Sequence, residues 1–126
     1  MIDNVKFPKD LVLRRMREAI DGVEFLTEHM YSVTFDVDGE PRKYTVSKGF
    51  PTDLASVPWG FRNIASQLDG IEAAVVHDHI YATGSMPRDV ADNLFLALLK
   101  ASGVGWAKRS AMYSAVRVGG WMAYKG

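Results

Sequence analysis

Residues 31–37 alternate between hydrophobic and polar side chains, which is the pattern of a strand with one buried face. An Asp-Gly dipeptide follows directly, and this is a favoured sequence for a two-residue hairpin turn. A second alternating run occupies residues 41–46, and the apolar residues of 23–29 can supply a third strand. We therefore predict a small antiparallel sheet or hairpin within residues 23–50.

The second half of the chain has hydrophobic residues three and four positions apart, which predicts helices. Asp69 suits the N-cap of the first helix, Pro87 suits the first turn of the second, and Gly103 stands where a C-cap glycine would end it. Gly119 and Gly120 break the third helix. The three predicted helices occupy residues 68–81, 85–103 and 105–124.

The remaining segments have weaker patterns. Residues 1–22 fit either an N-terminal arm with a short helix or a strand, and residues 51–66 contain the prolines and glycines of an ordered loop. The β-rich segment precedes a helical segment at residues 67–120, and this order is typical of an α+β fold. We predict a single domain over residues 1–126, in which the small sheet packs against a cluster of three helices.

The composition is that of an ordinary globular protein and argues against several function classes. Fifteen basic residues balance fifteen acidic ones, so no bulk positive charge attracts nucleic acid. The chain contains no cysteine, which excludes disulfides and thiolate metal sites. No apolar run approaches the roughly 20 residues that span a bilayer, and the first residues lack the pattern of a secretory signal. We therefore expect no nucleic-acid partner, no membrane span and a location in the cytoplasm.

Titratable residues gather on the first two predicted helices. Tyr81 is four residues after His77 and three after Asp78, so the three side chains share one edge of the first helix. Asp92 lies on the hydrophobic face of the second helix, where an unpaired carboxylate would be costly to bury. Because the loop between the helices is short, we expect them to run antiparallel. We therefore predict that His77 faces Asp92.

This arrangement supports two interpretations. An imidazole that is held by a carboxylate is fixed in one tautomer and suits a general base that activates water. In that case Asp78 could hold a hard cation such as calcium. Alternatively, His77, Tyr81 and Asp92 form a hydrogen-bonded network that fixes the packing of the helices. The sequence leaves both interpretations open.

Further residues are candidates for binding or supporting roles. Asp53 could cap a turn or reach the helix pair, and Ser56 lacks the sequence of a nucleophile elbow. Arg117, on the third helix, could pair with Asp89 or Asp92 or remain exposed. The loop that holds the first tryptophan could bind a partner. The candidate supporting residues are Asp53, Ser56, Arg88 and Trp59, and the tryptophans expected in the core are Trp59, Trp106 and Trp121.

Four motifs carry a resemblance to a known family: GFPTDLASVP, AAVVHDHIY, RDVADNLF and MYSAVRVGG, in this order. Over residues 23–120 the chain resembles the domain of unknown function 1353 family (DUF1353), small proteins encoded mostly by phages and prophages. The resemblance implies a phage or prophage origin and a location in the host cytoplasm or the virion. It implies no activity, because the family is named for lacking one. The family signature falls on Gly49, Phe50, Thr52, Asp53, Leu54, Ala55, Ser56, Pro58, His77, Asp78, Tyr81, Arg88, Asp92 and Phe95.

The first two predicted helices are also similar to the catalytic helix pair of secreted phospholipases A2. That pattern has His-Asp-x-x-Tyr on one helix and an Asp on the next. It implies that His77 activates water and that Asp78 binds calcium. Tyr81 and Asp92 would orient the histidine. This chain departs from the pattern because it has no cysteine and has SKGFPTDLASVPWG in place of a glycine-rich calcium loop. His-Asp phosphohydrolases also contain a His-Asp pair, but they need an upstream histidine on a helix, and His29 falls in a predicted strand.

Two functions follow from these observations. One is a small phage-encoded hydrolase of a lipid or another ester, with His77 as the base, Asp92 and Tyr81 as its supports, and a divalent cation such as calcium as the candidate cofactor. The other is a non-enzymatic virion, tail-assembly or host-interaction protein, in which the same residues form a structural network. Its partners would be phage structural proteins. The sequence indicates neither the substrate nor the oligomeric state.

Overall fold

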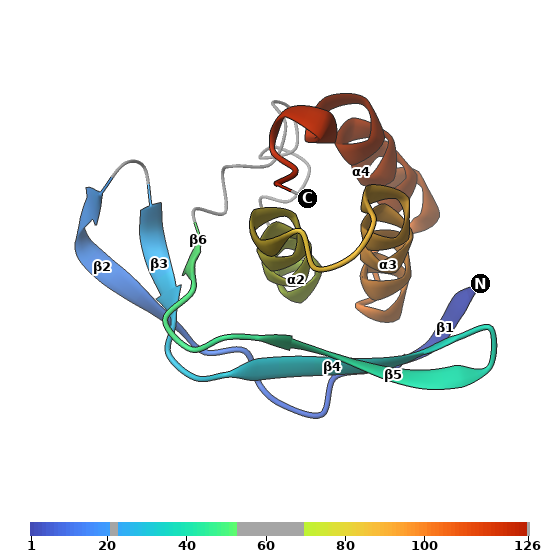
Figure 1. The fold of residues 1–126 in the computed structure, drawn as a ribbon, viewed down its shortest axis with the longest axis horizontal. Helices are drawn as coiled ribbons and strands as arrows, with labels where there is room; N and C mark the ends of the chain where they lie inside the picture. The colour runs from blue at the N-terminus through green and yellow to red at the C-terminus, as the bar shows by residue number, and fades with distance from the viewer. Residues whose placement is uncertain (21–22, 53–69, 126) are drawn as a thin grey trace. The chain divides into compact units, whose positions relative to one another are not determined.

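The computed structural model describes residues 1–20, 23–52 and 70–125 of the chain. The described residues form strands in the first half and helices in the second (Figure 1), which confirms the predicted α+β class. The chain divides into two compact units, Met1–Leu54 and Ala55–Gly126. Among the described residues, no helix is both long and apolar enough to cross a membrane.

The first sheet contains β1 (Ile2–Lys6), β4 (Tyr31–Val37) and β5 (Glu40–Val46), which pair antiparallel with β4 in the centre. β4 and β5 form the predicted hairpin (Figure 1). Its turn residues Asp38 and Gly39 have φ angles of 50° and 82°. Two consecutive positive φ angles are characteristic of the type I′ turn that an Asp-Gly sequence favours. The turn thereby sets the register of the two strands.

The second sheet contains β2 (Leu13–Ile20), β3 (Val23–Thr27) and β6 (Pro51–Thr52), again antiparallel, with β3 in the centre. The described residues therefore form two three-stranded sheets where one was predicted. For residues 1–22, where the sequence leaves open an arm with a short helix or a strand, the structure selects the strand alternative, with β1 and β2. The hydrophobic spacing of β2 suits a helix and a strand equally, and the hydrogen bonds that β3 offers decide between them.

Thr27, at the end of β3, holds the segment that follows β5. Its hydroxyl donates to the Ser47 carbonyl oxygen at 2.7 Å and accepts from the Phe50 amide at 2.8 Å. Its own amide donates to the Phe50 oxygen at 3.1 Å, and its carbonyl oxygen accepts from the Gly49 amide at 2.8 Å. Thr27 is buried, so these bonds satisfy polar groups that water does not reach. Residues 47–50 are thereby held in an ordered connection to β6.

The second unit contains α2 (Ile71–Thr83), α3 (Arg88–Ala101) and α4 (Trp106–Gly119), and a turn of 3-10 helix, η1 (Gly120–Met122), follows α4. α3 contacts both α2 and α4. These helices confirm the three that the hydrophobic spacing predicts. The break predicted at the two consecutive glycines is also present, because α4 ends where η1 begins.

The two ends of α3 follow the predicted signals. Pro87 stands immediately before the helix, where its lack of an amide hydrogen has no cost. Gly103 follows the helix with a φ angle of 85°, and its amide binds the Lys100 carbonyl at 3.1 Å. The Val104 amide binds the Leu99 carbonyl at 3.0 Å. This pair of bonds forms a Schellman motif, which glycine favours because the left-handed conformation strains other residues.

α2 and α4 differ in how much of their surface is buried. α2 buries residues on several faces, whereas α4 buries only Met112 and Val116. Trp106, at the start of α4, and Trp121, in η1, are exposed, so the prediction that they lie in the core is wrong. Hydrophobicity alone does not fix which side of a helix meets the core, and these two tryptophans lie away from it. Asp69, the predicted N-cap of α2, lies outside the described residues.

Candidate functional site

One carboxylate forms the centre of a polar cluster in the helical unit. Asp92 lies in the second turn of α3, and its side chain has no exposed surface. It lies on the same face of α3 as Phe95 and Leu99, which are also buried. An ionised carboxylate in such surroundings is stable only when other groups donate hydrogen bonds to its oxygens.

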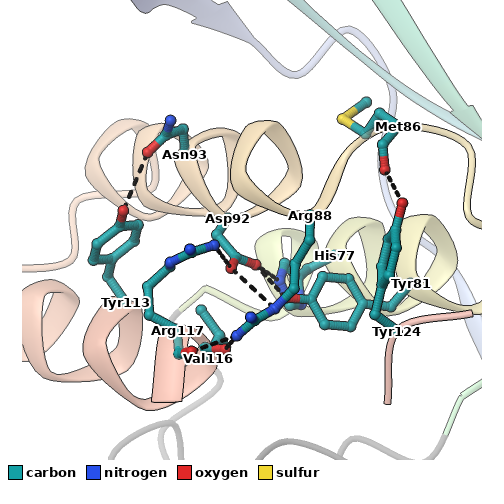
Figure 2. Close-up of polar contacts among 10 residues, drawn as sticks. All are labelled: His77, Tyr81, Met86, Arg88, Asp92, Asn93, Tyr113, Val116, Arg117 and Tyr124. Carbon is teal, nitrogen blue, oxygen red and sulfur yellow. Dashed lines mark hydrogen bonds and ion pairs between the residues drawn. The ribbon is translucent and has the colours of Figure 1, made fainter. Parts of the chain in front are cut away.

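The Oδ1 oxygen of Asp92 receives two hydrogen bonds from α2 (Figure 2). His77 Nε2 lies 2.7 Å from it, and the Tyr81 hydroxyl lies 2.5 Å from it. The two donors are four residues apart, so one helical turn places them on the same edge of α2. The contact predicted between His77 and Asp92 is therefore present, and Tyr81 joins it.

The Oδ2 oxygen of Asp92 faces two guanidinium groups. Arg117, from α4, donates through Nη1 at 2.8 Å. Arg88 Nε, one turn earlier on α3, lies 3.8 Å from the same oxygen. Of the two acids proposed as partners for Arg117, the structure selects Asp92, whereas Asp89 is exposed. Both oxygens of the buried carboxylate are thus engaged, and the nearby positive charge exceeds its negative charge.

Arg88 connects all three helices (Figure 2). Its Nε donates to the Tyr81 hydroxyl oxygen at 3.1 Å. Its Nη2 donates to two carbonyl oxygens in the last turns of α4, that of Val116 at 2.8 Å and that of Arg117. The Gly120 amide also donates to the Val116 oxygen, and Arg88 adds a cation at this helix C-terminus, where the helix dipole favours positive charge. Arg88 therefore fixes the end of α4 against the same tyrosine that binds Asp92.

The C-terminal residues pack against Tyr81. The ring of Tyr124 lies edge-on to the ring of Tyr81, with 5.2 Å between centroids, and its hydroxyl donates to the Met86 carbonyl at 2.7 Å. The Lys125 amide donates to the Tyr81 carbonyl oxygen at 2.8 Å. A Cβ atom at Gly120 would lie 2.7 Å from the Tyr81 hydroxyl oxygen, so a larger residue there would displace the phenol. The absence of a side chain at residue 120 therefore helps to place the Tyr81 hydroxyl.

The hydrogen bond to Asp92 determines the tautomer of a neutral His77. An ionised carboxylate only accepts, so His77 Nε2 carries the hydrogen and the lone pair of the neutral imidazole lies on Nδ1. The ring packs against those of Tyr81 and Phe95, with centroid distances of 4.1 and 4.7 Å, and its side chain is 8% exposed. No side chain among the described residues forms a hydrogen bond with Nδ1. Nδ1 is thus the nitrogen that can take a proton.

The cluster shifts the pKa values of its acids in opposite directions. Burial by itself would raise the pKa of Asp92, but hydrogen bonds from His77, Tyr81 and Arg117 outweigh it, and the pKa is lowered. Burial raises the pKa of Tyr81 well above its ordinary value, and the bond to Asp92 adds to this effect, while Arg88 opposes it. At neutral pH, Asp92 is therefore an anion and Tyr81 a neutral phenol that donates to it.

Asp78 is the residue that the sequence offers as a calcium ligand. It is half-buried and makes an interaction of its own. In the described part of the chain, no three histidine, aspartate or glutamate side chains come together in a way that could hold a metal ion. Calcium usually takes about six to eight oxygen ligands, some of them backbone carbonyls and waters, so the role of Asp78 as a calcium ligand stays a prediction.

The remaining sequence candidates fall into two groups. Asp53, Ser56 and Trp59 lie outside the described residues. Arg88, proposed only as a supporting residue, makes more contacts to the cluster than the sequence indicates. Gly120 and Tyr124 were not predicted to belong to the cluster, because they lie 39 and 43 residues beyond Tyr81 in the sequence. The signals near them were the motif MYSAVRVGG, which ends at Gly120, and the helix break at its two glycines.

Comparison with known proteins gives a family and no function. The family model described as "Protein of unknown function (DUF1353)" matches residues 28–116, well over half of the chain. The chain belongs to the DUF1353 family. Neither a curated protein nor a solved structure matches it.

The DUF1353 match contains most of the polar cluster. His77, Tyr81, Arg88 and Asp92 lie within it, and it ends one residue before Arg117. The part of the cluster that binds the Oδ1 oxygen therefore lies entirely within the family region. The second guanidinium comes from the residue directly after that region.

Proposed function

We propose that this member of the DUF1353 family is a small hydrolase in which His77 acts as the general base. The observation that supports this proposal is the 2.7 Å hydrogen bond between His77 Nε2 and Asp92, a carboxylate with no exposed surface. This bond holds the imidazole in one orientation and leaves the lone pair on Nδ1. A base of this kind removes a proton from water at neutral pH.

In the proposed reaction, Nδ1 of His77 takes a proton from water while the water oxygen attacks the carbonyl carbon of an ester. Asp92 stabilises the imidazolium that forms and remains ionised throughout. The bond between the carbonyl carbon and the alcohol oxygen then breaks, and the proton on Nδ1 passes to the departing oxygen. The products are a carboxylic acid and an alcohol, and His77 returns to its neutral form.

The other residues of the cluster act through Asp92 in this proposal. Tyr81 donates to the same oxygen as His77, so it restricts rotation of the Asp92 carboxylate. Arg88 and Arg117 provide positive charge beside the second oxygen and keep Asp92 ionised. These three are positioning residues, because none of them needs to touch the substrate.

The substrate that we propose is an ester, and a lipid ester in particular. The support for this choice is the similarity of α2 and α3 to the catalytic helix pair of secreted phospholipases A2, in which a histidine and a tyrosine share one aspartate. The resemblance to phage and prophage proteins supports a phage or prophage origin, with the protein in the host cytoplasm or the virion.

The decisive experiment compares His77→Gln with His29→Gln on the full chain. Hydrolysis of short-chain nitrophenyl esters and of phospholipid vesicles would be measured, with and without chelator. His29 is exposed and lies in the first unit, so its replacement serves as a matched control. We expect His77→Gln to reduce kcat at least about a hundredfold, the usual contribution of a general base. His29→Gln is expected to retain the wild-type rate.

Thermal unfolding of both variants separates loss of chemistry from loss of fold. His77→Gln leaves Asp92 with its tyrosine and arginine partners, so we expect the variant to fold. Equal rates in the wild type and in folded His77→Gln would refute the proposal. So would a wild-type chain that hydrolyses none of these esters.

The calcium ligand implied for Asp78 has a test of its own. Unfolding temperatures of the wild type and Asp78→Asn would be compared in calcium and in chelator, because a ligand that binds only the folded state stabilises it. A rise with calcium in the wild type alone would assign the ion to Asp78. A calcium-independent unfolding temperature would leave a metal-free base as the mechanism.

A second candidate function is that of a non-enzymatic phage structural or host-interaction protein. The observation that favours it is Arg88, whose contacts join α2, α3 and α4 around a carboxylate that has both oxygens bonded. A fully bonded polar network of this kind fixes the packing of helices without any reaction. For this candidate, His77→Gln lowers the unfolding temperature and the wild type has no hydrolytic activity.

A further inference from the structure

The residues that follow α4 form a short segment, which we call the C-terminal segment and define as residues 120–125. Gly120 is buried and Tyr124 is half-buried. The exposed residues of the segment are Trp121, Ala123 and Lys125. Among its described side chains, contacts with the rest of the helical unit therefore concentrate at Tyr124, next to the backbone of Gly120.

Two hydrogen bonds and one ring contact hold the C-terminal segment at the end of α2. The Lys125 amide donates to the Tyr81 carbonyl oxygen at 2.8 Å. The intrahelical partner of that oxygen would be the amide of residue 85, which lies beyond α2, so this bond is one that α2 itself does not supply. The Tyr124 hydroxyl donates to the Met86 carbonyl oxygen at 2.7 Å, and its ring lies edge-on to that of Tyr81 (Figure 2).

The C-terminal segment also approaches the phenol oxygen of Tyr81. A Cβ atom at Gly120 would lie 2.7 Å from this oxygen and 2.9 Å from the ring carbon Cε2. The phenol therefore fits beside residue 120 only because this residue has no side chain. The Tyr81 side chain is thus contacted by the C-terminal segment at two places, at Gly120 and at the Tyr124 ring.

The hydrogen bonds of Tyr81 tolerate little movement of its hydroxyl oxygen. This oxygen donates to Asp92 Oδ1 at 2.5 Å and accepts from Arg88 Nε at 3.1 Å. Hydrogen bonds between two oxygens span only about 2.5–3.0 Å, so a displacement of about 1 Å away from Asp92 breaks the bond. His77 donates to the same carboxylate oxygen, and it then shares a carboxylate that is less restrained.

We infer that Gly120 and Tyr124 are positioning residues, through which the C-terminal segment holds the Tyr81 phenol on Asp92 and so controls the orientation of His77. The control of the Tyr81 phenol stands on the contacts alone. Its effect on catalysis rests on the proposed hydrolase.

A simpler role for the C-terminal segment would be to bind the last turn of α2 and nothing more. The bond that serves this role comes from the Lys125 backbone, and side-chain substitutions leave that backbone amide in place. Substitutions at residues 120 and 124 therefore distinguish the two roles.

The test is proton NMR of the full chain at neutral pH. A hydroxyl proton in a short hydrogen bond, shielded from water, gives a downfield resonance, and its absence in Tyr81→Phe identifies the resonance of Tyr81. We expect Tyr124→Ala to abolish this resonance, and Tyr124→Phe to retain it because the ring contact remains. Tyr113→Ala is the matched control, since Tyr113 is also half-buried but its hydroxyl contacts Asn93 instead.

A second variant acts on the phenol from a different position. Gly120→Ala places a Cβ atom against the Tyr81 hydroxyl and is expected to abolish the same resonance. Gly105→Ala is its control at the other end of α4. A Cβ atom there meets nothing within 4 Å, and the φ angle of −62° suits alanine.

Ester hydrolysis by the same variants tests the effect on catalysis. We expect Tyr124→Ala to lower kcat about ten- to a hundredfold, the usual effect of a misplaced catalytic group, and Tyr124→Phe to restore most of it. A wild-type chain without hydrolytic activity would refute the proposed function, whereas the NMR comparison would still decide whether the C-terminal segment holds Tyr81.

Three results would overturn the inference. The first is a Tyr81 hydroxyl resonance that persists in folded Tyr124→Ala and folded Gly120→Ala, with folding checked by thermal unfolding. The second is its equal loss in Tyr113→Ala. The third is a wild-type spectrum from which Tyr81→Phe removes no downfield resonance, because the phenol would then not be held on Asp92.

Discussion

The two oxygens of Asp92 are bound by different kinds of donor. Oδ1 binds the imidazole of His77 and the phenol of Tyr81, both on α2, whereas Oδ2 faces the guanidinium groups of Arg88 and Arg117. The donors to Oδ1 are buried, but the side chains of Arg88 and Arg117 are 23% and 37% exposed. The positive charge that balances the carboxylate therefore comes from groups that keep part of their hydration.

The two sides of Asp92 therefore have different roles, charge balance on the arginine side and orientation of the proposed base on the histidine side. The arginine side compensates the carboxylate, so Asp92 stays ionised whether or not His77 carries a proton. The histidine side uses the resulting anion to orient an imidazole. Substitutions on the two sides should therefore have unequal effects on stability.

The largest effect is expected for Asp92→Asn, which abolishes the difference between the two sides. The amide has nearly the same shape, but it carries no charge and cannot accept through both of its polar atoms. Breaking a buried ion pair typically costs about 3 kcal/mol or more, and we expect a loss of that order in the free energy of unfolding. Urea unfolding at neutral pH measures it. A loss below about 1 kcal/mol would mean that the cluster contributes little to stability.

The next largest effect is expected for Arg88→Met on the arginine side. The variant keeps most of the apolar stem but loses the bonds to Tyr81 and to the α4 carbonyls. We expect a loss of about 2 kcal/mol in the free energy of unfolding, within the range for hydrogen bonds of charged groups.

Two controls accompany Arg88→Met. Arg88→Lys keeps the charge but lacks the planar guanidinium with its several N–H donors. It is therefore expected to recover only a small part of the lost free energy of unfolding. Arg42→Met removes an exposed arginine of β5 whose partners are Glu40 and the Pro41 carbonyl, and little change is expected there. Full recovery by Arg88→Lys would show that charge alone accounts for the role of Arg88.

A smaller effect is expected for Tyr81→Phe on the histidine side. The ring packing against His77 and Tyr124 remains, but the 2.5 Å bond to Asp92 is lost. One such bond typically contributes about 1 kcal/mol to the free energy of unfolding. Tyr113→Phe is the matched control, because its hydroxyl makes only a 3.3 Å exposed contact with Asn93. Equal losses in the two variants would contradict a special role for Tyr81.

The smallest effect concerns pH. The folded-state pKa of Asp92 is lowered below its ordinary value of 3.8, so its contribution to stability is fully present above that pH and is lost as the pH falls through the folded value. In Tyr81→Phe one of the bonds that lower this pKa is absent. The stability difference between wild type and Tyr81→Phe is therefore expected to be constant near neutral pH and to shrink below pH 3.8.

Urea unfolding at a series of acidic pH values measures this difference. Asp92→Asn is the control, because it has no carboxyl group to titrate at this position. The stability difference between Asp92→Asn and the double variant with Tyr81→Phe should show no such shrinkage. A wild-type difference that grows on acidification would contradict the pKa direction assigned to Asp92.

Local signals made part of the fold predictable. The hairpin of β4 and β5 follows from alternation and an Asp-Gly turn, and α3 follows from its spacing between Pro87 and Gly103. β2 was ambiguous and β6 was not predicted, because their pairing with β3 depends on residues distant in the sequence. A two-residue strand such as Pro51–Thr52 has no periodicity to detect.

The part of the candidate site that lies between the adjacent helices α2 and α3 was predictable from the sequence. The contact of His77 with Asp92 follows from helical spacing and a short loop. The choice of Arg117 between Asp89 and Asp92 depends on the rotation of α4 against α3, and no local pattern encodes that rotation. The same rotation leaves Trp106 exposed. Sequence reasoning therefore reached the histidine side of the cluster and left the arginine side open.

The order of the residues along the chain determines when the arginine contacts of Asp92 can form during synthesis. Asp92 is made 25 residues before Arg117, and the carbonyls that hold Arg88 belong to the same late segment of α4. During synthesis on a ribosome, α2 and α3 are complete before these groups exist. The nascent helix pair can form the contacts of His77 and Tyr81 to Asp92, but it lacks the second guanidinium and the anchor for the first. The charge balance of the helical unit is thus completed last, when the end of α4 emerges.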